Sequence, residues 1–181
     1  MNAPRTLRLA LDQNFPTPLI NAVRADLPSN LELQSLHEID PRLSDLDDRP
    51  LIIGLHQLGW DGLITNNYKM LEVPTEIAAI VMTKMIIVAI EGLGHDPLRA
   101  VGALLLELPG LPDRLKPHTS NVFRLAHRRR PPEDAWTYLQ RAADRVGLQA
   151  DQLWRRVRVR GDDSTTPSCP TPDSRRPSHN T

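Results

Sequence analysis

The sequence predicts an α/β fold in which a mostly parallel central sheet of four to five strands lies between two layers of helices. Short apolar runs of strand length alternate with segments whose apolar residues recur at helical spacing, as far as about residue 125. The run from Met85 to Ile90 is apolar throughout, which is typical of a parallel strand buried on both faces. Because helices that connect parallel strands cover the faces of their sheet, a three-layer α/β/α architecture follows.

The predicted elements follow one another along the chain. Strands are expected at residues 7–11, 31–35, 61–65, 85–90 and 121–125. Helices are expected to begin near Pro16, Pro50, Pro74 and Pro97, because proline is tolerated in a first helical turn. Residues 37–48 are acidic, contain Pro41 and are predicted as a loop.

Beyond the sheet, Pro131-Pro132-Glu133 is predicted to begin an accessory helix. The sequence therefore indicates an α/β domain over residues 1–125 and an arginine-rich helical segment over residues 126–160. Residues 161–181 are rich in Ser, Thr and Pro and are expected to be disordered.

Composition restricts the classes of function. Cys169 is the only cysteine, which excludes an intrachain disulfide and a multi-cysteine zinc site. The longest apolar run is too short to span a bilayer, and the first residues lack the apolar core of a signal peptide. A cytoplasmic protein without a membrane partner is therefore expected.

The net charge of zero conceals an uneven distribution. Residues 1–123 carry ten Lys and Arg against fifteen Asp and Glu, whereas residues 124–181 carry twelve against seven. The basic residues of the second part are all arginines, concentrated at 124–130 and 155–160. These clusters favour contact with phosphate, and the alternative is that they form solvated helix faces or internal salt bridges.

Polar side chains follow two of the predicted strands where each strand ends. Asp12-Gln13-Asn14 follows the first strand, and the apolar run Gly62-Leu63-Ile64 of the third strand leads into Thr65-Asn66-Asn67. Ligands of open α/β sheets bind outside the carboxyl ends of the strands. Carboxylate and amide oxygens are ligands that Mg²⁺ or Mn²⁺ prefers.

Each of these residues also has an ordinary structural interpretation. Asp12 and Asn67 are common turn residues, and Asn14 is a plausible cap for the helix near Pro16. Acidic residues such as Asp48 usually cap a helix and interact with its dipole. Asp61 precedes its strand and is expected at the opposite edge of the sheet, in a structural role.

Taken as an ordered set, three segments resemble the PIN-like domain superfamily, in particular the small PIN-like proteins of bacterial toxin–antitoxin loci. The segments are Leu9-Ala10-Leu11-Asp12-Gln13-Asn14-Phe15-Pro16, Asp48 at the start of a helix, and Asp61-Gly62-Leu63-Ile64-Thr65-Asn66-Asn67. The resemblance covers roughly residues 7–125. It implies hydrolysis of RNA phosphodiesters with Mg²⁺ or Mn²⁺, with Asp12 as the first metal ligand and Asp48 as the second acidic position.

The chain departs from the family pattern at two positions. Asn67 stands where the family usually has a third Asp, and Lys69 stands where many members carry a further acid. An amide oxygen such as that of Asn67 can bind a metal but brings no charge, and the positive charge of Lys69 opposes a cation. Both departures therefore weaken a cation site. Glu91 is a candidate for the late acidic residue of the family, although its alignment is open.

Two functions follow from the resemblance. The first is a metal-dependent ribonuclease in which Asp12, Asp48 and Asn67 form the catalytic site. The toxin component of a toxin–antitoxin pair is one example of such a ribonuclease. Its substrate would be bound by Asn14, Thr65, Arg128, Arg129 and Arg130. The second is a catalytically degenerate module that binds RNA or a protein. An antitoxin and a second copy of the chain are further partners that the sequence leaves open, and a phosphatase or phosphotransferase is a third interpretation.

Overall fold

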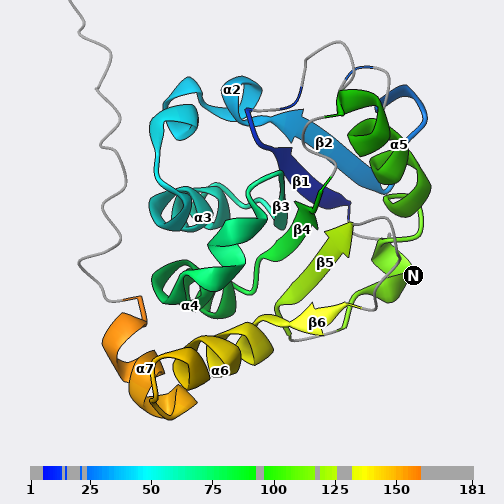
Figure 1. The fold of residues 1–181 in the computed structure, drawn as a ribbon. Helices are drawn as coiled ribbons and strands as arrows, with labels where there is room; N and C mark the ends of the chain where they lie inside the picture. The colour runs from blue at the N-terminus through cyan, green and yellow to red at the C-terminus, as the bar shows by residue number, and fades with distance from the viewer. Residues whose placement is uncertain are drawn as a thin grey trace, which may run out of the picture.

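The structure is a computed structural model of the 181-residue chain, and it describes residues 6–13, 15, 21, 24–92, 96–116, 119–125 and 132–159. A single six-stranded sheet has the order β2-β1-β3-β4-β5-β6 (Figure 1). The strands are β1 (Leu7–Leu11), β2 (Leu31–Ser35), β3 (Gly62–Thr65), β4 (Ile86–Ile90), β5 (Asn121–Leu125) and β6 (Glu133–Asp134). All neighbouring pairs are parallel except β5 with β6, which confirms the predicted fold class.

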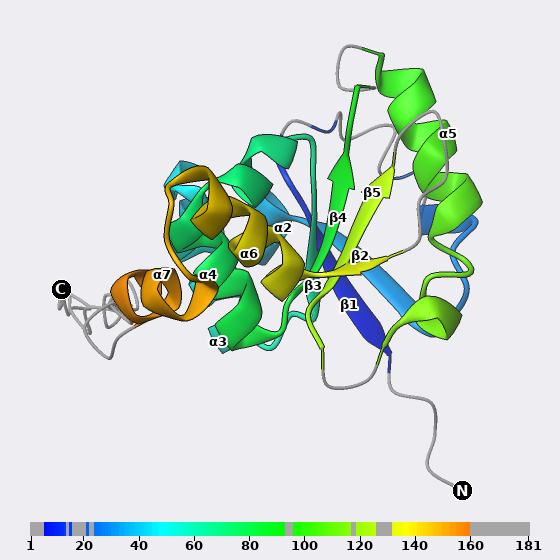
Figure 2. The same cartoon turned by 60° about the horizontal axis from the view of Figure 1, so that its bottom comes forward.

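Helices cover both faces of the sheet. The α-helices whose bounds lie within the described residues are α2 (Leu36–Ile39), α3 (Asp48–Gln57), α4 (Pro74–Thr83), α5 (Pro97–Glu107), α6 (Ala135–Arg145) and α7 (Ala150–Val157). Short 3₁₀ turns are η1 (Pro41–Asp45), η2 (Tyr68–Glu72) and η3 (Pro112–Arg114). Figure 2 shows α3, α4 and α6 on one side of the sheet and α5 on the other. None of the described helices is both long and apolar enough to cross a membrane.

Two local predictions were wrong. Residues 36–45 form α2 and η1 rather than a loop, because Ser35 and Glu38 make a reciprocal capping box that begins a helical turn. The helix predicted from Pro131 begins at Ala135 instead. Glu133 and Asp134, which precede this helix, pair with β5 as strand β6. Asp134 also caps the helix, because its side chain accepts a hydrogen bond from the Trp136 N–H.

Alternation along the strands divides the core into two layers. One layer faces α3, α4 and α6 and includes Ala10, Leu63, Ile87, Ala89 and Val122, whereas the other faces α5 and includes Leu9, Leu11, Ile64, Val88 and Phe123. At the start of β3, a Cβ on Gly62 would lie 2.6 Å from the Ile86 carbonyl oxygen. Glycine is therefore required where β3 passes closely beside its neighbours.

The described C-terminal segment packs on the same core as the sheet. The buried residues of α6 include Leu139, Ala142 and Ala143, which join the layer that faces α4. The rings of Trp136 and Trp154 meet edge to face, with centroids 5.6 Å apart, and so tie α7 to α6.

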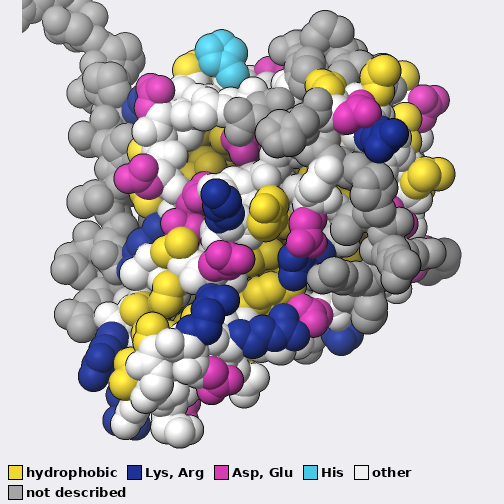
Figure 3. Space-filling model, viewed as in Figure 1, with side chains coloured by type: hydrophobic (Ala, Val, Ile, Leu, Met, Phe, Trp, Pro, Cys, Tyr) yellow, Lys and Arg dark blue, Asp and Glu magenta, His cyan; other side chains and the backbone are white. Residues whose placement is uncertain are grey.

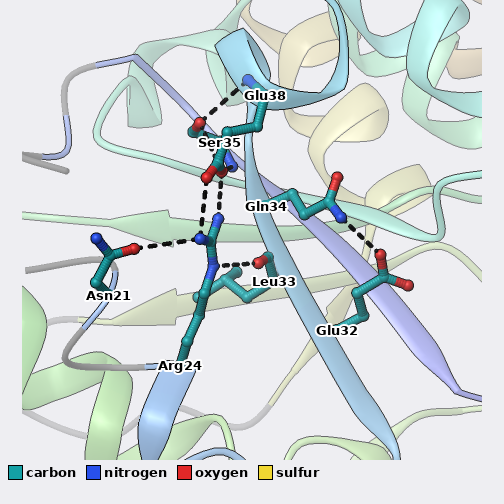
Figure 4. Close-up of polar contacts among 7 residues, drawn as sticks. All are labelled: Asn21, Arg24, Glu32, Leu33, Gln34, Ser35 and Glu38. Atoms are coloured by element: carbon teal, nitrogen blue, oxygen red, sulfur yellow. Dashed lines mark hydrogen bonds and ion pairs between the residues drawn. The ribbon is translucent and has the colours of Figure 1, made fainter.

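Arg24 covers part of the exposed edge of the sheet at β2 (Figure 4). Its Nε donates a hydrogen bond of 2.7 Å to the Leu33 carbonyl oxygen, and its guanidinium also pairs with Glu38. The Arg24 hydrogen bond, aided by the Ser35 N–H, lowers the pKa of Glu38 to about 2. Such contacts occupy polar groups that an edge strand otherwise offers to another chain.

Candidate functional site

The carboxyl ends of β1 and β3 lie side by side, as the sequence predicts. In the parallel register Leu11 pairs with Ile64, and the Asp12 N–H donates a hydrogen bond of 3.0 Å to the Ile64 carbonyl oxygen. The hydroxyl of Thr65, which is buried, donates a hydrogen bond of 2.8 Å to Oδ2 of Asp12. This contact fixes the orientation of a half-buried carboxylate at the strand end.

Asn67 links this strand end to helix α3. Its backbone N–H donates to the Thr65 hydroxyl over 2.9 Å, and its side-chain amide donates to Oδ2 of Asp48 over 2.6 Å. Asp48 lies in the first turn of α3. Asp12, Thr65, Asn67 and Asp48 therefore form one continuous series of hydrogen bonds across three elements, and the structure brings together the three residues proposed as catalytic.

Glu76, in the first turn of α4, is a further acidic residue of the site that the sequence reasoning missed. Its pKa is raised to about 7, first by burial and then by the negative charge of Asp48 and a hydrogen bond shared with it. In the sequence, Pro74-Thr75-Glu76 indicates only the start of a helix, because glutamate in a first turn is ordinary. The available signal was that this helix is the first α-helix after the polar end of β3, with only the short turn η2 between them.

The carboxylates of the site repel one another. Burial raises the pKa of Asp48, and the negative charge of Asp12 raises it further. We call Asp12, Asp48 and Glu76 the acidic cluster. Near neutral pH the Asp48–Glu76 pair retains a proton for part of the time, because two adjacent half-buried carboxylates resist full ionisation.

The carboxylate oxygens of Asp12 and Asp48 are the type of donor that a hard divalent cation takes. Oε2 of Glu76 is buried and accepts no hydrogen bond from any residue that the structure describes, so either a proton shared with Asp48 or a cation would satisfy it. Within the described ranges, no three His, Cys, Asp or Glu side chains are already grouped for metal binding. Mg²⁺ commonly takes only one or two carboxylates and keeps several waters, so Asp12 and Asp48 are sufficient in number.

Of the other predicted residues, only some fall within the part of the chain that the structure describes. Asn14, Arg128, Arg129 and Arg130 are outside the residues that the structure describes. Lys69 is exposed on η2. Asp61 accepts a hydrogen bond of 2.9 Å from the Arg8 N–H at the other end of the strands, which is the structural role expected for it. Glu91, just after β4, forms an ion pair of 2.6 Å with Arg124.

Comparison with known proteins gives no match. No family model matches the chain, and neither a curated protein nor a solved structure matches it significantly.

Proposed function

We propose that this chain is a PIN-like ribonuclease whose acidic cluster uses Mg²⁺ or Mn²⁺ to hydrolyse RNA phosphodiesters. The observation that carries the proposal is the convergence of Asp12 and Asp48, which come from a strand end and a helix start and are connected through Thr65 and Asn67. Convergence of carboxylates at the carboxyl edge of a parallel sheet is the arrangement that the sequence resemblance implies.

Each residue of the site has a role in this proposal. Asp12 and Asp48 hold the cation, which when bound lowers the pKa of a water and stabilises charge on the phosphate. Thr65 holds Asp12 in position through its hydroxyl. Glu76 adds negative charge beside Asp48 and strengthens attraction for a cation.

Further features belong to the same proposal. The arginines at 128–130 would contact the RNA backbone, where contacts carry no sequence information. The protein would act in the cytoplasm, with an antitoxin or a second copy of the chain as its protein partner.

Cleavage of single-stranded RNA tests the proposal directly. The wild-type protein is incubated with labelled RNA in Mg²⁺, Mn²⁺ or EDTA, and the products are separated by electrophoresis. Cleavage is expected only with a cation, and Asp12→Asn is expected to reduce the rate by about a hundredfold or more. Asp144→Asn, an exposed carboxylate on α6, is the matched control and should retain the wild-type rate. Equal cleavage by both variants would refute the proposal.

A catalytically degenerate RNA- or protein-binding module is the second candidate. Its specific support is that the Asn67 amide satisfies Asp48 without any cation. Retention of RNA without cleavage in every cation would favour this module over the ribonuclease.

A further inference from the structure

A small cavity lies between η2, β5 and α6 and has no role in the function proposed so far. It encloses about 100 Å³ and is lined by Tyr68, Glu72, Arg124, Tyr138, Arg141 and Arg145, among others. Figure 3 shows basic and acidic side chains mixed together over α6 and the adjoining part of the sheet. Three of the lining residues are arginines, so an anion is the ligand that this cavity would bind most favourably.

The cavity adjoins the acidic cluster through the register of the sheet. Thr65 pairs with Ala89, and Ala89 pairs with Arg124, so the three residues form one row across β3, β4 and β5. Neighbouring strands are 4.7–4.9 Å apart, which places the α-carbons of Thr65 and Arg124 about 10 Å apart. Ala89 contributes only a methyl group between them, and Tyr68 directly follows Asn67 in the chain.

The three guanidinium groups keep donors available. Arg124 pairs with Glu91, and its Nε is buried without a hydrogen bond to any residue that the structure describes. Arg141 pairs with Glu133 at 3.0 and 3.1 Å, and Arg145 donates to the Glu72 carbonyl oxygen over 3.2 Å. A guanidinium has five N–H donors, so these contacts leave several for an anion.

Tyr138 offers a further donor in the same cavity. The residue is 5% exposed, and its hydroxyl oxygen is buried without a hydrogen bond of ordinary geometry to any described residue. Burial, with Glu133 close by, raises the pKa of this phenol to about 12. The hydroxyl therefore keeps its proton and is able to donate it to an anionic oxygen.

We infer that this cavity binds one phosphate group of single-stranded RNA, next to the phosphodiester at the acidic cluster. The inference rests on the proposed function and adds the site that positions its substrate. Guanidinium N–H donors bind phosphate in pairs, and Arg124 and Arg145 each use only one terminal nitrogen in the contacts described above. Glu72, Glu91 and Glu133 match the three arginines in number, so binding depends on directed hydrogen bonds from the guanidinium groups and the Tyr138 hydroxyl rather than on net positive charge.

RNA binding in EDTA tests the cavity without cleavage. Anisotropy of a labelled single-stranded RNA is measured for the wild type, for Arg141→Gln/Arg145→Gln and for Arg155→Gln/Arg156→Gln. The second double variant is the control. It removes the same amount of positive charge as the first, but from two exposed arginines of α7 that do not line the cavity. The cavity variant is expected to bind about tenfold more weakly, with a salt slope smaller by about 0.7 for each phosphate that is no longer neutralised. The α7 variant should bind like the wild type.

Equal losses of affinity in the two double variants would overturn the inference in favour of diffuse charge, as would absence of RNA binding by the wild type. Tyr138→Phe provides a test that does not disturb the ion pairs. A several-fold loss of affinity at an unchanged melting temperature is expected, and unchanged affinity in both this variant and the cavity double variant would overturn the inference.

The two proposals fail in different ways. Binding that depends on the cavity, without cleavage in Mg²⁺ or Mn²⁺, would refute the ribonuclease and retain the phosphate site. Metal-dependent cleavage, with equal RNA binding by all variants in EDTA, would refute the phosphate site alone.

Discussion

The side-chain amide of Asn67 donates a hydrogen bond of 2.6 Å to Oδ2 of Asp48. An aspartate at position 67 could not make this contact when ionised and would add a negative charge to a site that already contains Asp12, Asp48 and Glu76. The amide therefore allows the acidic cluster to remain assembled without a cation. Asn67 thus brings less charge to the site than an aspartate would, and in exchange it stabilises the cation-free protein.

The first prediction concerns Asn67→Asp. In EDTA this variant should lose about 1–3 kcal/mol of unfolding free energy, because it removes a hydrogen bond and introduces repulsion. Added Mg²⁺ should stabilise the variant more than the wild type, because a site with another carboxylate binds the cation more tightly. Denaturant unfolding with and without Mg²⁺ measures both effects. The same stability as the wild type under both conditions would contradict the prediction.

The second prediction concerns pH. Glu76 has a pKa of about 7 in the folded protein against 4.5 in the reference state, so between these values the folded state binds more protons. The contribution of Glu76 to stability should therefore be complete below about pH 4.5 and be lost as pH rises from about 4.5 to 7. Glu76→Gln should flatten this decrease. Above pH 7 the free energy of unfolding of the variant should exceed that of the wild type by about 1 kcal/mol, a modest difference because the Glu76 carboxyl is partly exposed to solvent.

The pH window separates Glu76 from other shifted groups. The pKa values of Glu38 and Asp40 are lowered to about 2, so their stabilisation is lost only as pH falls below about 4.5. Urea unfolding at intervals between pH 5 and 8 therefore isolates the acidic cluster. Stability that rises with pH across this window would show that the Asp48–Glu76 pair does not retain its proton.

The third prediction concerns Thr65, whose hydroxyl donates to Asp12 and accepts from the Asn67 N–H. Thr65→Val keeps the shape of the side chain but removes the hydrogen bond to each partner, so it should cost about 1–3 kcal/mol. Thr65→Ser retains the hydroxyl and should be clearly more stable than the valine variant. Thermal unfolding of the two variants measures the difference, and equal melting temperatures would argue against the hydrogen-bond series.

The fourth prediction concerns the packing of α6. Leu139 is fully buried in the layer that faces α4, so Leu139→Ala should cost about 2–5 kcal/mol. Leu106→Ala is the control, because Leu106 is 83% exposed and its truncation should change stability by less than about 0.5 kcal/mol. Circular dichroism and tryptophan fluorescence should report one common transition. Separate transitions would show that α6 and α7 unfold independently of the sheet.

Much of the fold was predictable from the sequence because the relevant signals are local. The apolar runs that become β1, β3 and β4 have the length and composition of buried strands, and the prolines mark the starts of α4 and α5. Two-residue strand β6 and short helix α2 were missed because elements of that length carry almost no periodicity. Their formation depends on pairing with β5 and on the capping box at Ser35.

The candidate site divides in the same way. By itself the sequence determined that Asp12 follows one strand, that Thr65 ends another and that Asp48 begins a helix, because strand and helix termini are marked by neighbouring residues. Only the tertiary structure decided that Glu76 lies against Asp48 and that Arg124 lies one strand beyond Ala89 in the row of Thr65. Those relationships depend on strand order, register and the packing of α4, which are set by long-range side-chain contacts rather than by local pattern.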